Sequence, residues 1–101
     1  MTINEPILTI SVAAQLLGLH PRTLMLYEQK KLFTPFRTNT QRRMFSGKDL
    51  ENLQFIKFLT QQEGINLKGV KVVLEAISAA EAGGVNLKSL LFPDFKAEKL
   101  F

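Results

Sequence analysis

Apolar residues recur at the spacing of an α-helix in several stretches of the chain, and polar caps or glycines separate these stretches. In the first stretch, Val12, Leu16 and Leu19 suit one buried face of a helix. Ser11 stands just before it, where a helix N-cap belongs. Gly18 marks its end, because glycine adopts the left-handed backbone of a helix C-terminus without steric cost. The pattern therefore predicts a short helix that starts after Ser11.

A second helix is predicted almost at once. His20 suits its N-cap, and Pro21 suits its first position, where the missing N–H costs nothing. Thr23–Lys30 then supplies roughly two helical turns, and we expect Leu24 to face the first helix. Two short helices joined by a tight turn that contains glycine form a helix-turn-helix.

After the second helix the pattern becomes typical of a β-hairpin. Pro35 disfavours a helix, and the polar run Thr38–Gln41 separates Phe36–Arg37 from Arg42–Phe45. We interpret this segment as a two-stranded wing. The alternative is a solvated surface hairpin without a binding role. A further β-like run, Ile7–Ile10, precedes the first helix.

Two longer helices follow the wing. Ser46 and Asp49 have the spacing of a capping box, and the third helix runs to about Gln62. Asn66 suits the cap of a fourth helix, whose apolar positions extend to Ile77. Glycines and a proline interrupt the remainder of the chain. Together these elements predict a mainly α-helical fold: a winged helix-turn-helix with a small β-hairpin wing, about four helices and a short C-terminal extension.

Positive charge is concentrated on one part of the sequence. Between His20 and Lys48, Glu28 is the single acidic residue, and the formal charge is +6; the remainder of the chain carries −2. The basic residues of this segment are Arg22, Lys30, Lys31, Arg37, Arg42, Arg43 and Lys48. Such a patch favours a polyanionic partner, and the phosphate backbone of a nucleic-acid duplex is the obvious one.

Several other function classes find no support in the sequence. The chain has no cysteine and one histidine, which excludes disulfides and argues against transition-metal sites. We find no nucleophile paired with a base and no phosphate-binding glycine loop, so we expect neither enzyme activity nor a cofactor. No signal peptide and no apolar run approaching ~18 residues is present, so we expect a cytoplasmic protein without a membrane segment.

Four segments in this order resemble the MerR superfamily of winged helix-turn-helix regulators, and most closely its HspR-type heat-shock repressor branch. They are SVAAQLLGLHPRTLMLYE, RTNTQRRMF, SGKDL and EGINLKGVKVVLE. The resemblance covers residues 8–77 and implies a DNA-binding domain over residues 1–78. Residues 79–101 would then form a short C-terminal extension with a possible role in dimerisation.

The resemblance implies a dimeric transcription factor that binds a pseudo-palindromic promoter site in double-stranded DNA. The second helix would enter the major groove, and the wing would follow the backbone. The predicted DNA-binding residues are His20, Arg22, Thr23, Tyr27, Arg37, Arg42 and Arg43. Alternatives remain open for two kinds of residue: Arg22, Lys30 and Lys31 could form a solvated helix face, and Tyr27 could be a core or rim aromatic. Since neighbouring residues of a strand point to opposite faces, we expect at most one of Arg42 and Arg43 to face DNA squarely and the other to support the wing or to contact a second phosphate.

One position departs from the family pattern. Relatives place an arginine after the Thr-Leu pair of the recognition helix, where Met25 stands here, and many carry an aromatic residue where Leu26 stands. Methionine cannot make the bidentate contact of arginine with guanine or phosphate. Either Met25 contacts an apolar group such as a thymine methyl, or DNA binding is weakened.

The extension is too short for a ligand-binding domain or a long coiled coil, so a dimer would need a compact surface. The residues predicted for it are Phe55, Phe58, Leu59, Leu91 and Phe92, with helix four, Leu90 and Phe95 beside them. The alternative is that these residues close the core of a single chain. HspR-type repressors also imply a chaperone of the Hsp70 type as co-repressor.

Two functions are compatible with the sequence. The first is a small promoter-binding repressor, for instance of stress or chaperone genes, which the charged segment and the wing favour. The second is an excisionase-like architectural factor that bends DNA, or a winged-helix module that no longer recognises DNA bases and binds a protein. Met25 and the short C-terminus favour the second.

Overall fold

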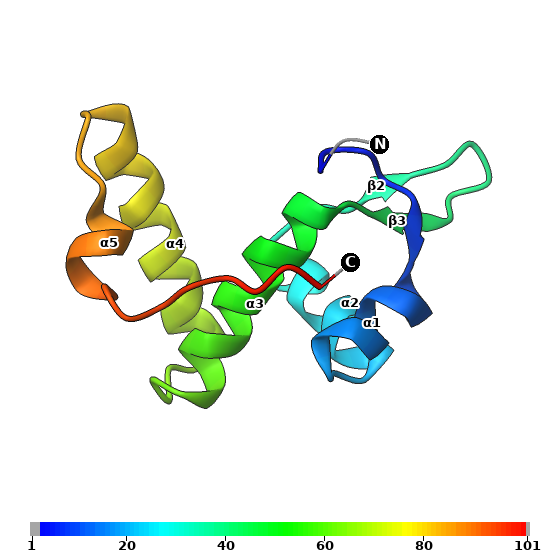
Figure 1. The fold of residues 1–101 in the computed structure, drawn as a ribbon, viewed down its shortest axis with the longest axis horizontal. Coiled ribbons are helices and arrows are strands. Elements are labelled where there is room, and N and C mark those ends of the chain that lie inside the picture. Colours follow the sequence, from blue (N-terminus) through cyan, green and yellow to red (C-terminus); the bar gives the residue numbers. More distant parts are fainter. Residues whose placement is uncertain (1–2, 101) are drawn as a thin grey trace.

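The computed structural model describes residues 3–100. Met1 and Thr2 of the predicted domain 1–78 and Phe101 of the predicted extension 79–101 therefore lie outside the described residues. Within this range the chain forms five helices and three short strands (Figure 1). In chain order they are β1 (Leu8–Thr9), α1 (Ile10–Leu17), α2 (Pro21–Gln29), β2 (Phe36–Arg37), β3 (Arg43–Phe45), α3 (Gly47–Gln61), α4 (Leu67–Ala82) and α5 (Leu87–Leu91). The predicted fold, a mainly helical winged helix-turn-helix, is confirmed.

The helix-turn-helix forms through the local chemistry that the sequence predicted. Gly18 has φ +68°, and its N–H bonds to the carbonyl oxygens of α1, which ends that helix. The Nδ1 atom of His20 accepts the N–H of Arg22 at 3.0 Å, and Pro21 occupies the first turn of α2. Leu24 is fully buried in the same core cluster as residues of α1. The caps on both sides of the turn therefore set where each helix ends and begins.

The start of α1 corrects one prediction. Thr9, not Ser11, is the N-cap: its Oγ1 atom accepts the N–H of Val12 at 3.3 Å. Thr9 is also the last residue of β1, so the strand runs directly into the helix without a loop. Ser11 consequently lies inside the first turn of α1.

The wing is a three-stranded antiparallel sheet in the order β1-β3-β2. β3 is central: Phe45 lies opposite Leu8 of β1, and Met44 lies opposite Phe36 of β2. The predicted hairpin is thus confirmed, and the β-like run before the first helix adds a third strand. Because β1 continues into α1, the sheet anchors the hairpin to the helix-turn-helix.

α3 lies between the helix-turn-helix and the α4–α5 pair, as Figure 1 shows. The capping box at its start is formed: Ser46 Oγ accepts the N–H of Asp49, and Asp49 Oδ2 accepts the N–H of Ser46. Its buried side chains include Leu50, Leu53 and Ile56. Contacts with α1 and with α4 explain why α3 carries more apolar residues than one narrow stripe requires.

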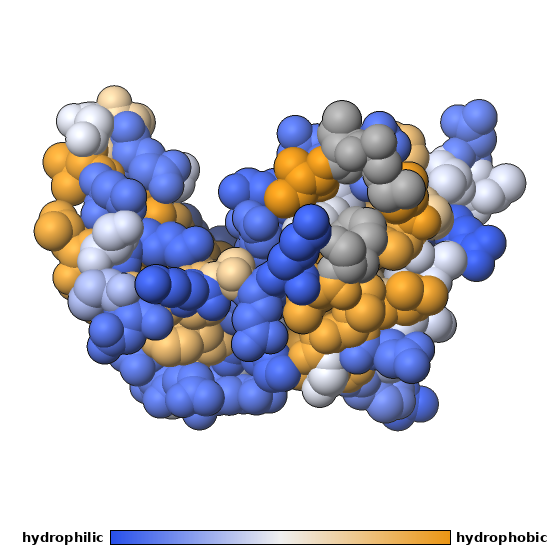
Figure 2. Space-filling model, viewed as in Figure 1, coloured by the Kyte–Doolittle hydropathy of each residue, from blue (hydrophilic) through white to orange (hydrophobic). Residues whose placement is uncertain are grey.

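The C-terminal extension contains a fifth helix and then crosses back over α3 toward α1 (Figure 1). Asn86 caps α5 by accepting the N–H of Ser89 through Oδ1. Farther along, Gln54 of α3 donates to the carbonyl of Glu98 at 2.8 Å and accepts its N–H at 2.7 Å. In the space-filling view of Figure 2, a notch separates the α4–α5 part from the rest, and hydrophilic residues cover the tip of the wing.

Most of the residues predicted for the dimerisation surface pack within the chain, and their role in dimerisation stays a prediction. The rings of Phe55 and Phe58 contact those of Phe92 and Phe95 of the extension, with centroid separations between 5.1 and 5.8 Å. Phe55 is 3% exposed, and Leu59 is fully buried. Phe58 and Phe92 are partly buried, whereas Leu91 is 54% exposed. These aromatic residues close the core of a single chain, which was the alternative interpretation, because the returning extension covers α3.

Candidate nucleic-acid interface

One face of α2 is directed to solvent. Its exposed residues are Arg22, Met25, Leu26 and Gln29, which have the spacing i, i+3, i+4 and i+7. Leu24 and Tyr27 point the other way and are buried. The exposed face therefore begins with a guanidinium and carries two apolar side chains, each 39% exposed, at its centre.

Glu28, on the last turn of α2, joins this helix to both strands of the hairpin. Its Oε2 atom lies 2.9 Å from Nη2 of Arg37 on β2, and its Oε1 atom lies 2.6 Å from Nε of Arg43 on β3. Burial raises the pKa of the Glu28 carboxyl, but the hydrogen bonds and charges of Arg43 and Arg37 outweigh it and hold the pKa below its usual value. Glu28 is thus a charged carboxylate that bridges the helix and the wing.

The two adjacent wing arginines have different roles. Arg43 is half-buried against Glu28, whereas Arg42 is exposed and has no ion pair among residues 3–100. Arg43 therefore connects the wing to α2, and a DNA contact of Arg42 stays a prediction. Around the tip, the N–H of Thr38 donates to the carbonyl of Arg42, and the N–H of Arg42 donates to Oγ1 of Thr38. Gln41 has φ +66°. Arg37 also donates to the carbonyl of Gln41 at 2.9 Å.

The other predicted site residues lie near these groups. Thr23 is half-buried on the first turn of α2, and His20 is committed to its cap. Tyr27 is 3% exposed, which places most of its ring in the core. Within the described range its hydroxyl has no hydrogen bond, and no buried side-chain oxygen or nitrogen is unpaired, so the hydroxyl reaches solvent. Lys30 and Lys31 are exposed just after α2.

The role of Glu28 is not among the sequence-based predictions, in which this residue is only the single negative charge of the basic segment. A signal was available, since one acidic residue among seven basic ones invites the question of what it pairs with. Which arginines pair with it depends on tertiary structure, because Arg43 lies 15 positions away in the chain.

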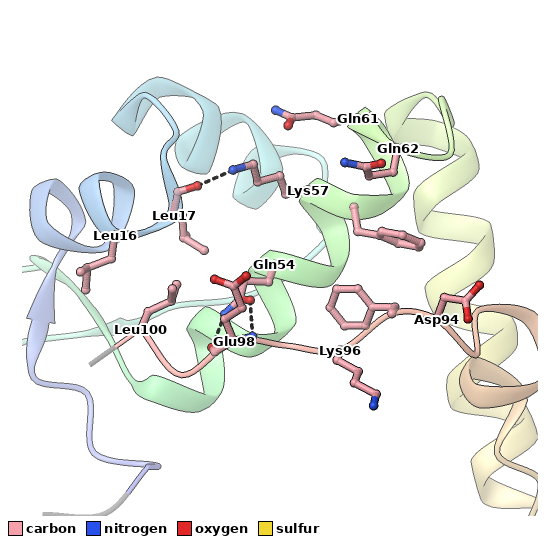
Figure 3. A pocket seen from close by; sticks show the side chains of 12 residues that line it. Leu16, Leu17, Gln54, Lys57, Gln61, Gln62, Asp94, Lys96, Glu98 and Leu100 are labelled. Atoms are coloured by element: carbon pink, nitrogen blue, oxygen red, sulfur yellow. Dashed lines mark hydrogen bonds between the residues drawn. The ribbon is translucent and has the colours of Figure 1, made fainter.

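A second concave surface lies between α1, α3 and the returning extension (Figure 3). Lys57 donates through Nζ to the carbonyl of Leu17 at 2.7 Å, which satisfies the C-terminal end of α1. Gln54 faces the backbone of Glu98 in the same groove. These groups serve hydrogen bonds within the chain, and they do not form a nucleophile–base arrangement.

Residues 3–100 contain no group of three or more His, Cys, Asp or Glu side chains placed to hold a metal ion. Among the helices of this range, none has the length and apolar character needed to cross a membrane.

Comparison with known proteins agrees with this geometry. The chain is 47% identical over 75 residues to a protein of Streptomyces coelicolor described as a putative heat shock protein HspR, covering 74% of this chain and 50% of that protein. It is 39% identical over 71 residues to the HTH-type transcriptional regulator GlnR of Bacillus anthracis, covering 70% of this chain and 54% of the relative. The chain therefore spans about half the length of these relatives.

A family described as MerR HTH family regulatory protein matches residues 8–77. These residues run from β1 through most of α4 and include the whole helix-turn-helix and wing. The match and the identity with HspR confirm the resemblance seen in the sequence motifs. The chain belongs to the MerR family of helix-turn-helix regulatory proteins.

Proposed function

We propose that this protein is a DNA-binding transcriptional regulator that represses stress or chaperone genes. One observation carries the proposal: α2, which has an exposed face, is joined through Glu28 to a wing whose Arg42 has no ion pair within the described range. Both belong to the segment of charge +6. Similarity to regulators named HspR and GlnR supports the same function.

The geometry suggests how the two elements divide the work. α2 enters the major groove with Arg22 at its N-terminal end, where residues of recognition helices reach base edges and phosphates. Arg42 extends from the wing toward the phosphate backbone. Met25 and Leu26 offer apolar contact to thymine methyl groups and no hydrogen bond to guanine. Affinity then depends strongly on phosphate contacts and on salt.

The proposal includes a homodimer on an inverted repeat, because two half-sites require two copies of the helix-turn-helix. Since Phe55, Phe58, Leu59 and Phe92 are occupied within one chain, the exposed apolar residues Leu90 and Leu91 of α5 are better candidates for the contact. A cytoplasmic location and an Hsp70-type co-repressor complete the proposal, and neither enzyme activity nor a cofactor forms part of it.

Selection of bound sequences from a random duplex pool tests this function. The wild-type chain should enrich an inverted repeat, and Arg42→Ala should weaken its capture. Binding must fall with rising salt, since phosphate contacts release counterions. If no duplex is retained at low salt, the DNA-binding function is wrong.

An architectural role is the second candidate, and the apolar centre of α2 favours it. A factor of that kind bends DNA and reads few bases. The same selection would then enrich flexible steps without an inverted repeat. A bend measured by circular permutation of the enriched duplex would support this alternative.

A further inference from the structure

The carboxylate of Glu28 stands where a DNA-binding surface should avoid negative charge. It lies on the last turn of α2 and is the single acidic residue between His20 and Lys48. Phosphates near α2 and the wing would be repelled by it. The contacts of Glu28 with the rest of the chain must therefore provide a benefit that outweighs this repulsion.

Those contacts bridge three elements. The two oxygens of Glu28 bind one arginine each, at 2.9 Å on β2 and 2.6 Å on β3. The side chain of Glu28 is 20% exposed, so solvent screens these pairs less than it screens a surface pair. Strands of two and three residues hold a hairpin only weakly by themselves. The carboxylate thus fixes both strands against the recognition helix.

The connection continues to the tip of the wing. Arg37 binds Glu28 through Nη2 and the carbonyl of Gln41 through Nη1. Gln41 directly precedes Arg42 and has a left-handed backbone with φ +66°, a conformation that costs energy for a residue with a side chain. A continuous path of hydrogen bonds therefore leads from α2 to the residue next to the exposed arginine.

We propose that Glu28 is a positioning residue for DNA binding, which holds the wing against α2 so that Arg42 and the exposed face of α2 meet one duplex together. This inference rests on the proposed function. Its benefit is preorganisation, since a wing already fixed in place loses less conformational freedom on binding. The repulsion between Glu28 and phosphate is offset because two guanidinium groups neutralise its charge.

The substitution Glu28→Gln separates this role from simple electrostatics. Removing a negative charge raises the charge of the segment, so electrostatics alone predicts tighter binding. Positioning predicts the opposite, a loss of about fivefold to tenfold. Glu63→Gln is the matched control: Glu63 is exposed, lies beyond α3 and loses the same charge. Anisotropy titration of the selected duplex with each variant measures the affinities.

A double-mutant cycle with Arg42→Ala gives a second readout that a general loss of stability would not move. If Glu28 positions Arg42, the alanine substitution should cost about tenfold in the wild type and much less in the Glu28→Gln background. If Arg42→Ala lowers the affinity equally in both backgrounds, the inference is overturned. It is also overturned if Glu28→Gln binds the duplex as tightly as Glu63→Gln does. Circular dichroism establishes that each variant is folded. If Glu28→Gln does not fold, Glu28→Asp, whose shorter side chain cannot span both arginines, takes its place in the cycle.

The outcomes distinguish this inference from the function on which it rests. Absence of duplex binding by the wild type overturns both. Binding by the wild type with an additive cycle overturns only the role of Glu28.

Discussion

Arg37 and Arg43 face each other directly across the β2–β3 pair, and both bind the same carboxylate. Two like charges directly opposite each other on paired strands would repel each other and weaken the hairpin. With Glu28 between them they become part of a three-residue ion pair that connects the wing to α2. Two arginines expected to contact DNA thus also have a structural role, which leads to different predictions for adjacent residues.

Arg42→Ala and Arg43→Ala should have different effects on stability. Arg42 is exposed and has no ion pair with any residue that the structure describes, so its loss should leave the free energy of unfolding within about 0.5 kcal/mol of the wild type. Arg43 binds a partly buried carboxylate, and its loss should cost about 1 kcal/mol after allowance for screening by solvent. Urea unfolding followed by circular dichroism measures both values. Equal values for the two variants would contradict the assignment of Arg43 to the ion pair.

The same ion pair should make stability depend on pH in the acidic range. The pKa of Glu28 is lowered in the folded chain, so its ionised form stabilises the fold fully above the ordinary pKa that a glutamate has in the unfolded chain. This contribution is lost as the pH falls through the lower folded-state pKa. Melting temperatures of wild type and Glu28→Gln should therefore differ at neutral pH and converge in acid. A constant difference down to pH ~2 would mean that the carboxylate contributes no such linkage.

Phe55→Ala should destabilise a single chain by about 3 kcal/mol, since its buried ring contacts three other phenylalanine rings. Leu91→Ala is the control: this side chain is mostly exposed, and its loss should change stability by about 0.5 kcal/mol or less. Urea unfolding at low protein concentration gives both numbers. If Phe55→Ala instead kept its stability and only lost self-association in sedimentation, the ring would belong to a dimer contact.

Met25→Arg should restore a donor at the centre of the exposed face of α2. We expect tighter binding to the selected duplex and a salt dependence of log K that is steeper by about one unit, because one more phosphate or guanine contact becomes available. Val72→Arg adds the same charge to an exposed position of α4 and serves as the control. Equal gains from both substitutions would show that only net charge matters.

Much of the fold follows from local sequence signals. The glycine at position 18, the histidine cap and proline of α2, and the capping box of α3 act within a few residues, so the sequence alone predicts them. The start predicted for α1 lies two residues late, because Thr9 and Ser11 are both hydroxyl residues able to cap a helix. Because β1 extends to Thr9 and α1 begins at the next residue, Thr9 and not Ser11 becomes the N-cap.

Features that join distant parts of the chain could not be predicted in this way. The pairing of Leu8 with Phe45 and the bridge from Glu28 to Arg43 depend on how the elements pack. The apolar surplus of α3 was recognised, but its pattern does not identify what covers it. Here the extension returns and places Phe92 and Phe95 on it.

The hydrogen bonds between Gln54 and Glu98 have a consequence for how the extension can vary. One side-chain amide pairs with an N–H and a carbonyl of the main chain, as a neighbouring strand would. The identity of the side chain at position 98 does not enter this pairing, and only proline, which lacks the N–H, is excluded. The side chain at position 98 can therefore be changed while the path of the extension over α3 is kept.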